Sequence, residues 1–475
     1  MATGNLNPPL AFLEESAVSV DEAHENSARV VWMLAWPAVL LNSLQVVNSL
    51  LDRGFVGQLE APAITAQSAS INIIFLMISL SMTLSTSATA LVSRAFGAAK
   101  PAEYRTSCSQ CLRVAIIGGL VAAAATVFIA FLFAKHLVPA SETRAMALMT
   151  TYLLAFAAGM PAFFIIQSLA GSLRGVGDTK SPMVISGIQI VLHIALNFIL
   201  VFPPREIAGG IHLPGFDLGL LGAGVALSSS AWTSALLYLI YMRRTPLGGT
   251  NPFRLPRWDW TRRILRIATP AAAMAILRVS SLIVLTLIVK EVPNGASAIA
   301  ALGIAFSIEG IMFMPAFGLS MAAAALVGQS LGMKRPQRAE RLGWTASHMA
   351  GLIVLALVVP IFIGAYPIAM LMTNGKEAIA AETASLLRFL CATEVMFAYA
   401  MVTIGALQGA GDTVWPMWIT VIAQWLIRVP MAYIFAIPMG MGATGVWLSF
   451  AISQAVQGIL AMAAFKQGRW KLKEV

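Results

Sequence analysis

Four polar side chains interrupt the first strongly apolar segment of the chain: Asn42, Gln45, Asn48 and Asp52. They are spaced by three, three and four residues, so in a helix they lie on one face. Burial in an apolar environment favours the neutral form of a carboxylate. This face should therefore point into the protein, and Asp52 could take up and release protons. The alternative is that Asp52 lies at an interface, where it pairs with Arg53 or caps the next loop.

A second polar face is expected between residues 182 and 202. Gln189, His193 and Asn197 follow one another at intervals of four residues, which again aligns them on a helix. Histidine changes its charge near physiological pH, so His193 is a candidate for proton exchange. Its ring could instead be satisfied by a neighbouring carbonyl group. Gln189 and the three amides of the first segment are predicted to line a substrate cavity.

Two further carboxylates, Glu309 and Glu394, and two cations, Arg278 and Arg428, occur within apolar segments of the second half of the chain. Ionisable groups in such segments are rare and usually functional. Either Arg278 forms an ion pair with one of the two acids, or the acids form a second site for a cation or a substrate.

The elements that position these residues are predicted from composition and hydropathy. The chain has 475 residues, of which 58% are hydrophobic and 11% are charged, whereas soluble domains have about 25% charged residues. Apolar runs of about 20 residues are long enough to cross a bilayer. Twelve runs are predicted to be transmembrane helices, at 31–56, 64–92, 112–134, 146–170, 182–202, 218–242, 264–290, 298–327, 344–367, 384–408, 415–438 and 442–465. The fold class is therefore an all-α integral membrane protein.

The distribution of basic residues predicts the orientation. An even number of spans puts both termini on one side, and most of the 31 lysines and arginines fall in loops or tails of that side. Basic residues favour the cytosol, so both termini are expected there. The predicted organisation is a disordered cytosolic tail at 1–28, an N-terminal six-helix lobe at 29–243, a basic cytosolic linker at 244–262, a C-terminal lobe at 263–466 and a cytosolic tail at 467–475.

The second half of the chain repeats the first. Leu173-Arg-Gly-Val-Gly-Asp-Thr179 matches Leu407-Gln-Gly-Ala-Gly-Asp-Thr413 at an offset of 234, and Pro37 matches Pro270 at 233. Each half has an even number of helices, so the two lobes should be related by a pseudo-twofold axis along the membrane normal. Such lobes can enclose a central cavity, which indicates transport rather than a structural role.

Several function classes are excluded by the pattern. Cys108 and Cys111 have a Cys-x-x-Cys spacing but no further ligands nearby in the sequence, and the five histidines are scattered. Neither a metal site nor a catalytic cluster is therefore predicted. No phosphate-binding loop motif is present, and basic residues sit in short loops, which argues against ATP hydrolysis and nucleic-acid binding. We expect no enzyme activity and no cofactor.

These features resemble the multidrug and toxic compound extrusion (MATE) family over residues 28–468. The resemblance rests on Pro37, on the segment Asp52-x-x-Phe55-Val-Gly-x-Leu59, on the paired Gly-Asp-Thr turns and on Arg428-Val-Pro430. The acid at Asp52 on the first predicted helix resembles the pattern of the prokaryotic branches of the family, including the DinF-like group. The resemblance implies two six-helix lobes and antiport of drugs against protons or sodium.

The resemblance also assigns roles to residues. It implies a functional acid at Asp52 and, on the fifth helix, an Asn and an Asp that help to bind sodium. This chain departs from that pattern, with His193 and Asn197 at those positions. Sodium prefers oxygen ligands, so an Asp52–His193 pair favours protons. The resemblance also implies acids on the seventh, eighth and tenth helices. Glu394 matches the position on the tenth helix well, and Glu309 matches the position on the eighth less closely. The seventh helix has Arg278 instead of an acid.

The prediction is therefore a monomeric membrane protein that exports small organic compounds, cationic or amphiphilic, in exchange for protons by rocking of its two lobes. Its partners are these small molecules, protons or sodium, and the lipid bilayer of the cell membrane. Sodium coupling and a flippase for a lipid-linked substrate are the alternatives.

Overall fold

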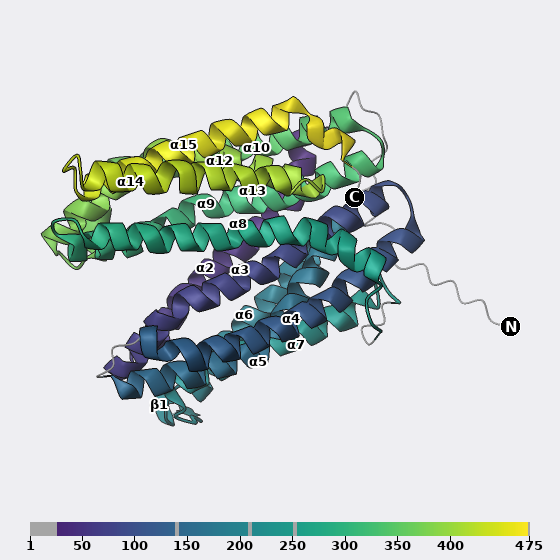
Figure 1. The fold of residues 1–475 in the computed structure, drawn as a ribbon. Helices are drawn as coiled ribbons and strands as arrows, with labels where there is room; N and C mark the ends of the chain where they lie inside the picture. The colour runs from purple at the N-terminus through teal and green to yellow at the C-terminus, as the bar shows by residue number, and fades with distance from the viewer. Residues whose placement is uncertain (1–25, 138–141, 208–210, 250–253, 474–475) are drawn as a thin grey trace.

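The computed structural model describes residues 26–137, 142–207, 211–249 and 254–473. They form two helical lobes that lie side by side (Figure 1). The N-terminal lobe consists of α2 (Ser27–Val56), α3 (Ala61–Gly97), α4 (Pro101–Leu137), α5 (Thr143–Gly175), α6 (Lys180–Leu200) and α7 (Gly219–Met242). A short antiparallel hairpin, β1 (Arg205–Ile207) and β2 (Ile211–Leu213), joins α6 to α7.

The C-terminal lobe repeats this arrangement with more interruptions. It consists of α8 (Trp258–Lys290), α9 (Gly295–Gly332), α10 (Pro336–Ile363), α11 (Ala365–Met372), α12 (Glu377–Gly409), α13 (Val414–Thr420), the π-helical segment η1 (Val421–Arg428), α14 (Val429–Ala436), α15 (Ala443–Gln467) and the 3-10 turn η2 (Arg469–Leu472). The segments α13, η1 and α14 form one continuous span.

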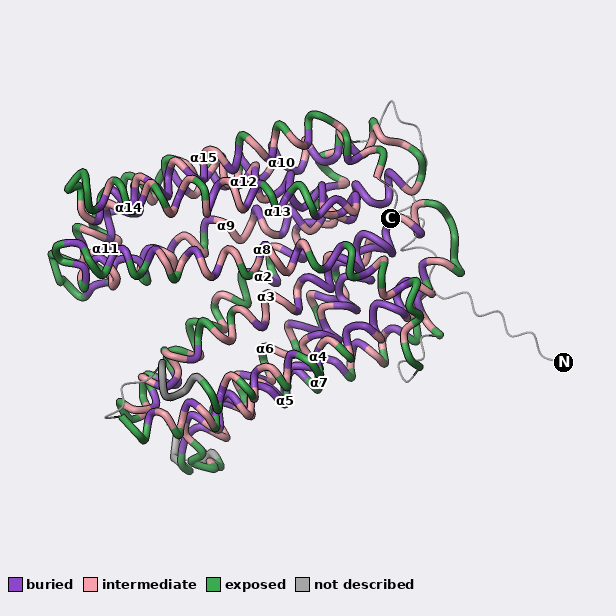
Figure 2. The backbone as a smooth tube through the Cα atoms, in the orientation of Figure 1, coloured by how far each residue is buried: buried purple, intermediate pink, exposed green. Residues whose placement is uncertain are grey.

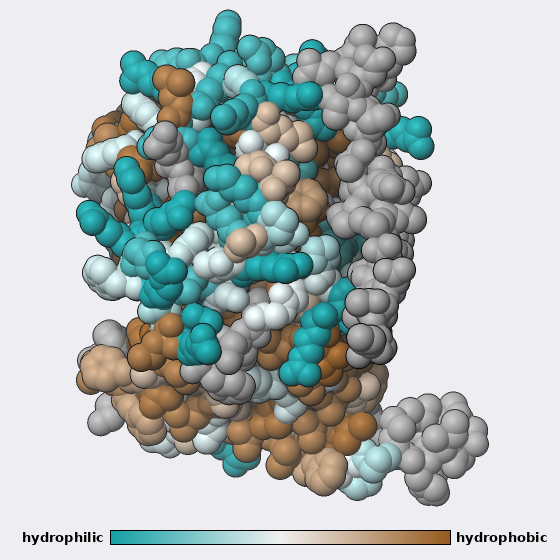
Figure 3. Space-filling model, turned by 90° about the vertical axis from the view of Figure 1, so that its right-hand side faces the viewer, coloured by the Kyte–Doolittle hydropathy of each residue, from teal (hydrophilic) through white to brown (hydrophobic). Residues whose placement is uncertain are grey.

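Twelve helices in the described part of the chain are long and apolar enough to cross a membrane, which confirms the predicted fold class. Several helices are longer than hydropathy predicts; α4, for example, begins at Pro101 rather than near residue 112. Helical hydrogen bonding continues beyond the apolar stretch into polar ends. In the view of the end that bears both termini, hydrophilic side chains cover the centre and upper part (Figure 3).

The two lobes use equivalent packing. In the first lobe α5 packs against α3, α4 and α7, and in the second α12 packs against α9, α10 and α15. Buried residues run through both lobes (Figure 2), and the most apolar stretches of α5 and α12 are 78% and 61% buried. At the repeated turns, Gly177 and Gly411 have φ values of 93° and 85°, a left-handed geometry that glycine adopts without strain.

The predicted organisation can be compared with the helix bounds. Of the expected tail at 1–28, residues 1–25 lie outside the described part of the chain, and α2 begins at Ser27. Residues 250–253 of the expected linker also lie outside it, and the last five linker residues already belong to α8. In the expected tail at 467–475, of which 474–475 are not described, η2 packs Trp470 against Phe465 with ring centroids 4.8 Å apart.

The lobes touch at the end of the molecule that bears the termini and diverge towards the other end (Figure 1). Gln329 of α9 donates to the carbonyl oxygen of Gly175 on α5 at 2.9 Å, and Ser87 of α3 donates to that of Ile264 on α8 at 3.3 Å. Gly97 of α3 lies directly against the backbone of Gln329. These contacts close one end and leave a cavity between the lobes.

Candidate functional site

Asp52, His193 and Asn197 come together in the N-terminal lobe. Nε2 of His193 lies 2.8 Å from Oδ1 of Asp52, and Nδ2 of Asn197 donates to the same oxygen at 2.9 Å. The amide nitrogen is also 3.1 Å from Nε2 of the histidine. The structure therefore forms the pair expected from the sequence, and the described residues show no pairing of Asp52 with Arg53.

The position of the cluster follows from two helices. His193 and Asn197 are one turn apart on α6, and α6 packs against α2, where Asp52 is four residues from the helix end. The edge of the Phe55 ring meets Phe198 at a centroid distance of 4.9 Å, which fixes the register of α2 against α6. The predicted helical faces are thus directed towards one another.

Burial separates the two titratable groups. The His193 side chain is 3% exposed, whereas that of Asp52 is 29% exposed. Nδ1 of His193 and Oδ1 of Asn197 are buried without a hydrogen-bond partner among the described residues. Because Nδ1 has no acceptor, the neutral tautomer with the proton on Nε2, donated to an ionised Asp52, fits this arrangement best.

Sequence reasoning missed a residue of this cluster. Tyr152 of α5 is buried and lies within electrostatic range of Asp52 and close to Gln67 of α3. A single tyrosine in an apolar helix gave no periodic signal, and only the packing of α5 against α3 identifies it.

The predicted substrate-cavity residues are placed elsewhere. Asn42 is buried with an unpartnered Nδ2, Asn48 has a buried unpartnered Oδ1, Gln45 is exposed and Gln189 is half-buried. None of the four is among the described residues that line the cavity between the lobes.

A second polar cluster lies inside the C-terminal lobe. Gln454 of α15 donates to Glu309 at 3.0 Å and accepts from Thr393 at 2.8 Å. Glu394 is fully buried, both of its carboxyl oxygens lack a hydrogen-bond partner among the described residues, and it lies within electrostatic range of Glu309. The two predicted acids are therefore neighbours.

The cation near these acids is Arg428, not Arg278. Arg428 interacts electrostatically with Glu309, donates to Ser453 at 2.7 Å and lies over the Phe450 ring at 4.4 Å. The described part of the chain shows no ion pair between Arg278 and either acid, so the first of the two sequence alternatives is not observed. Gln454 and Arg428 complete a cluster that spacing alone could not assemble.

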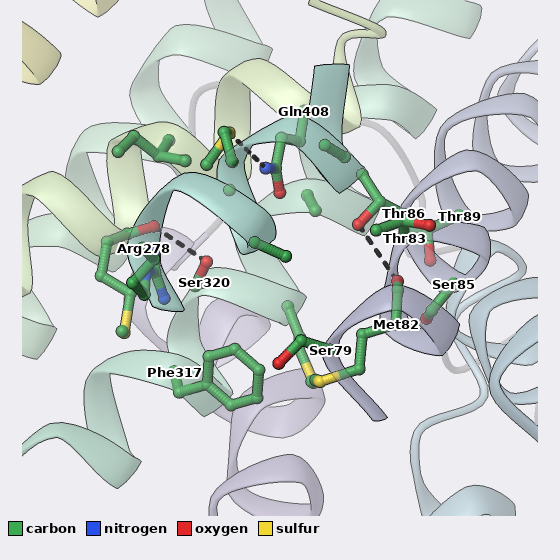
Figure 4. Close-up of a pocket in the computed structure, with 18 of the residues that line it drawn as sticks. Ser79, Met82, Thr83, Ser85, Thr86, Thr89, Arg278, Phe317, Ser320 and Gln408 are labelled. Atoms are coloured by element: carbon green, nitrogen blue, oxygen red, sulfur yellow. Dashed lines mark hydrogen bonds between the residues drawn. The ribbon is translucent and has the colours of Figure 1, made fainter. Parts of the chain in front are cut away.

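Arg278 lines the cavity between the lobes instead. This cavity has a volume of about 210 Å³ and is walled by α3 and α5 of one lobe and by α8, α9, α12 and α15 of the other. Arg278, Ser320, Phe317 and Gln408 surround it opposite Ser79 and Met82 (Figure 4). Arg174 is the other charged residue of its described lining.

Two six-helix lobes, buried ionisable clusters within the spans and a cavity between the lobes define a two-lobed membrane transporter. A family model described as MatE matches residues 37–199 and 270–434. The chain belongs to the MatE family, which confirms the predicted family. Because members of this family are transporters, the prediction that the chain is not an enzyme is also confirmed.

Individual relatives agree along nearly the whole chain. A Thermotoga maritima protein described as probable multidrug resistance protein NorM is 27% identical over 454 residues, 93% of each chain. A Bradyrhizobium diazoefficiens protein with the same description is 28% identical over 444 residues, 91% of this chain and 92% of the relative. The solved structure of a MATE protein in complex with MaL6 superposes with a TM-score of 0.84 at 22% identity, covering 94% of this chain and 96% of the other.

Proposed function

We propose that the protein is a secondary active exporter that moves small organic compounds out of the cell in exchange for protons bound at Asp52 and His193. The observation that supports this most directly is the 2.8 Å contact between a half-buried carboxylate and a buried imidazole. The relatives described as multidrug resistance proteins support the class of cargo.

The pair can respond to one added proton. In the ionised state, His193 and Asn197 both donate to Oδ1 of Asp52. A proton added to the imidazole makes the buried Nδ1 a donor without an acceptor, and an unpaired buried donor is costly. Protonation of Asp52 instead removes the charge that holds the two donors. Protonation of the carboxylate therefore weakens the contact between α2 and α6, whereas an imidazolium would remain held to the carboxylate by an ion pair.

Helix α2 connects this pair to the other lobe. Its first half packs Val31 and Ala35 against Met312 and Ala316 of α9, while its last turns hold Asp52 against α6. A change in the hydrogen bonds at Asp52 therefore acts on a helix that touches both lobes. This arrangement supports coupling of proton binding to a rocking movement of the lobes, in a monomer, about the contacts at the termini.

The excess of basic residues in the terminal loops supports cytosolic termini in the cell membrane. In that orientation the closed end faces the cytosol and the cavity faces outward. Inward movement of a proton down a potential of 100 mV provides about 2.3 kcal/mol, and a pH gradient adds to this. No nucleic acid or cofactor enters the proposal.

The test is uptake of fluorescent organic compounds into inside-out vesicles, with a proton gradient or a sodium gradient imposed separately. We expect the proton gradient alone to drive uptake and Asp52→Asn to abolish it. The matched control is Asp259→Asn, because Asp259 is exposed and pairs with Arg257 in the first turn of α8. Proton-driven uptake that persists in Asp52→Asn contradicts the proposal.

Sodium coupling is the second candidate, and a specific observation favours it. The bare carboxyl oxygens of Glu394 beside Glu309 are oxygen ligands of the kind that a hard cation prefers. If sodium alone drives uptake and Glu394→Gln abolishes it while Asp52→Asn does not, the coupling site lies in the C-terminal lobe. A flippase for a lipid-linked substrate is supported only if neither gradient drives uptake of soluble compounds.

A further inference from the structure

We infer that the cavity between the lobes binds an amphiphilic organic anion, whose negative group lies against Arg278. This inference rests on the proposed export function and specifies its cargo. It differs from the cationic cargo that the sequence suggests, because the acids of the C-terminal lobe are not where that prediction requires them.

The charge of the cavity is the first argument. Among the described residues that line it, the two charged side chains are Arg174 and Arg278, and no carboxylate contributes. Glu309 and Glu394 lie within the C-terminal lobe and outside this lining. A cavity whose walls have a low dielectric constant concentrates the field of such charges. The electrostatic potential of this cavity is therefore positive, and it repels cations.

Arg278 is available to a ligand. Within the described part of the chain, the Arg278 guanidinium has no ion pair and no side-chain hydrogen bond. The charged group within its electrostatic range is Arg428, which is also a cation. Arg278 lies twelve residues before the end of α8, about 18 Å along the helix axis at ~1.5 Å per residue. A cation at this depth is costly unless a partner or a function retains it.

Arg174 has a different role. Its side chain is 5% exposed and donates to Oγ of Ser85, which also lines the cavity. It lies at the end of α5 where the lobes touch. Arg174 therefore contributes positive charge at the closed end, while the forked donors of Arg278 remain free for a bidentate contact with a carboxylate, sulfonate or phosphate group.

The remaining lining predicts the rest of the ligand. Phe75, Phe317, Met82, Met274 and Met321 provide aromatic and thioether surface, which adapts to apolar bodies of varied shape. Gln408 is on the same cavity, and among the described residues its amide donates only to Met274 Sδ, at 3.9 Å, so it can also donate to an anion. One fixed cation beside an adaptable apolar wall suits an apolar compound with one negative group.

The test compares three dansyl compounds of similar size: dansylglycine (an anion), dansylamide (neutral) and dansylethylenediamine (a cation). Binding to the full chain in nanodiscs is followed by dansyl fluorescence without any ion gradient. We expect dansylglycine to bind most tightly. Arg278→Gln should weaken dansylglycine at least about ten-fold, equivalent to ~1.4 kcal/mol, and leave dansylamide unchanged, which shows that the variant is folded.

Two controls sharpen the result. Arg278→Lys keeps the charge and should retain part of the affinity, whereas Arg257→Gln removes an exposed arginine paired with Asp259 outside the cavity and should change nothing. Equal or tighter binding of dansylethylenediamine, unchanged dansylglycine binding in Arg278→Gln, or no binding of any compound overturns the inference.

Displacement experiments identify the source of the anion and separate the two proposals. Displacement of dansylglycine by 1-naphthoate or by farnesyl diphosphate supports an anionic ligand, and the tighter competitor distinguishes a soluble acid from a lipid-linked phosphate. If the anion binds as expected but a proton gradient does not drive its uptake, the coupling proposal fails and the cavity assignment stands. Proton-driven uptake of the cation but not of the anion supports the coupling proposal and overturns the cavity assignment.

Discussion

At the scale of single residues, the N-terminal cluster combines a group that water can reach with one that it cannot. Asp52 is partly exposed and His193 is not, so a proton arriving from solvent meets the carboxylate first and the imidazole second. In the proposed coupling, Asp52 receives the proton and His193 regulates how firmly it is held.

His193→Asn tests that role. The substitution removes a hydrogen bond to a charged group, worth about 1.5–3 kcal/mol, so we expect proton-driven uptake to fall at least about ten-fold. The matched control is His348→Asn, because His348 is exposed on α10 and contacts Tyr399 of α12 at 2.8 Å, within the other lobe. Full activity in His193→Asn would show that the histidine is a packing residue.

The sequence predicted residues that share a helix better than residues that meet across helices. His193 and Asn197 are spaced by one helical turn, and their contact with Asp52 followed from the family pattern. Gln454 and Arg428 lie near Glu309 only because α15 and η1 pack beside α9 and α12. The described residues show no ion pair between Arg278 and either acid, and Arg278 lines the cavity instead. Hydropathy could not predict this, because it does not report which side of a helix faces a cavity.

At the scale of elements, the twelve spans were predictable because an apolar run of about 20 residues has one stable form in a bilayer. The helix ends were not, since they continue into polar sequence. The hairpin β1–β2 and the π-helical turns of η1 were also not predicted. A local widening of helical turns leaves no mark in the hydropathy of the sequence. The nearest sequence feature is Pro430, two residues after the end of η1.

Close backbone contacts between α3 and α9 suggest an element-scale prediction. A Cβ on Gly97 would lie 2.0 Å from the carbonyl oxygen of Gln329 in the other lobe. Overpacking of this kind costs about 1–3 kcal/mol, so Gly97→Ala should shift the equilibrium away from the form closed at the terminal end by about five- to 150-fold.

Spin labels at Lys100 and Lys334, both exposed in loops of opposite lobes, measure this shift as a longer distance by electron resonance. Gly54→Ala is the control, because nothing lies within 4 Å of a Cβ at that position. An unchanged distance distribution in Gly97→Ala would mean that the interface accommodates the methyl group by local relaxation.

At the scale of the whole molecule, the proposed exchange has an electrical signature. A proton moving in and an organic anion moving out both transfer positive charge inward, so one cycle moves two charges. A potential of 100 mV, negative inside, then contributes about 4.6 kcal/mol per cycle, twice the value for one charge. Exchange of a proton for a cation is electrically neutral.

Potassium gradients with valinomycin test this signature in vesicles. We expect a potential imposed at constant pH to drive dansylglycine transport, and its reversal to slow it. A transport rate that does not change with the imposed potential would mean that the cargo crosses together with a compensating positive charge.

The equivalent packing of the two lobes has a consequence for the residues at equivalent positions. At the repeat offsets of 233 to 235 residues, the position of Asp52 falls near Leu285, and the positions of Glu309 and Glu394 fall near Ile74 and Met160. Equivalent positions of two repeated halves can therefore carry different residue types. Each ionisable cluster of the described residues lies in one half only, and the protein is symmetric in shape but not in chemistry.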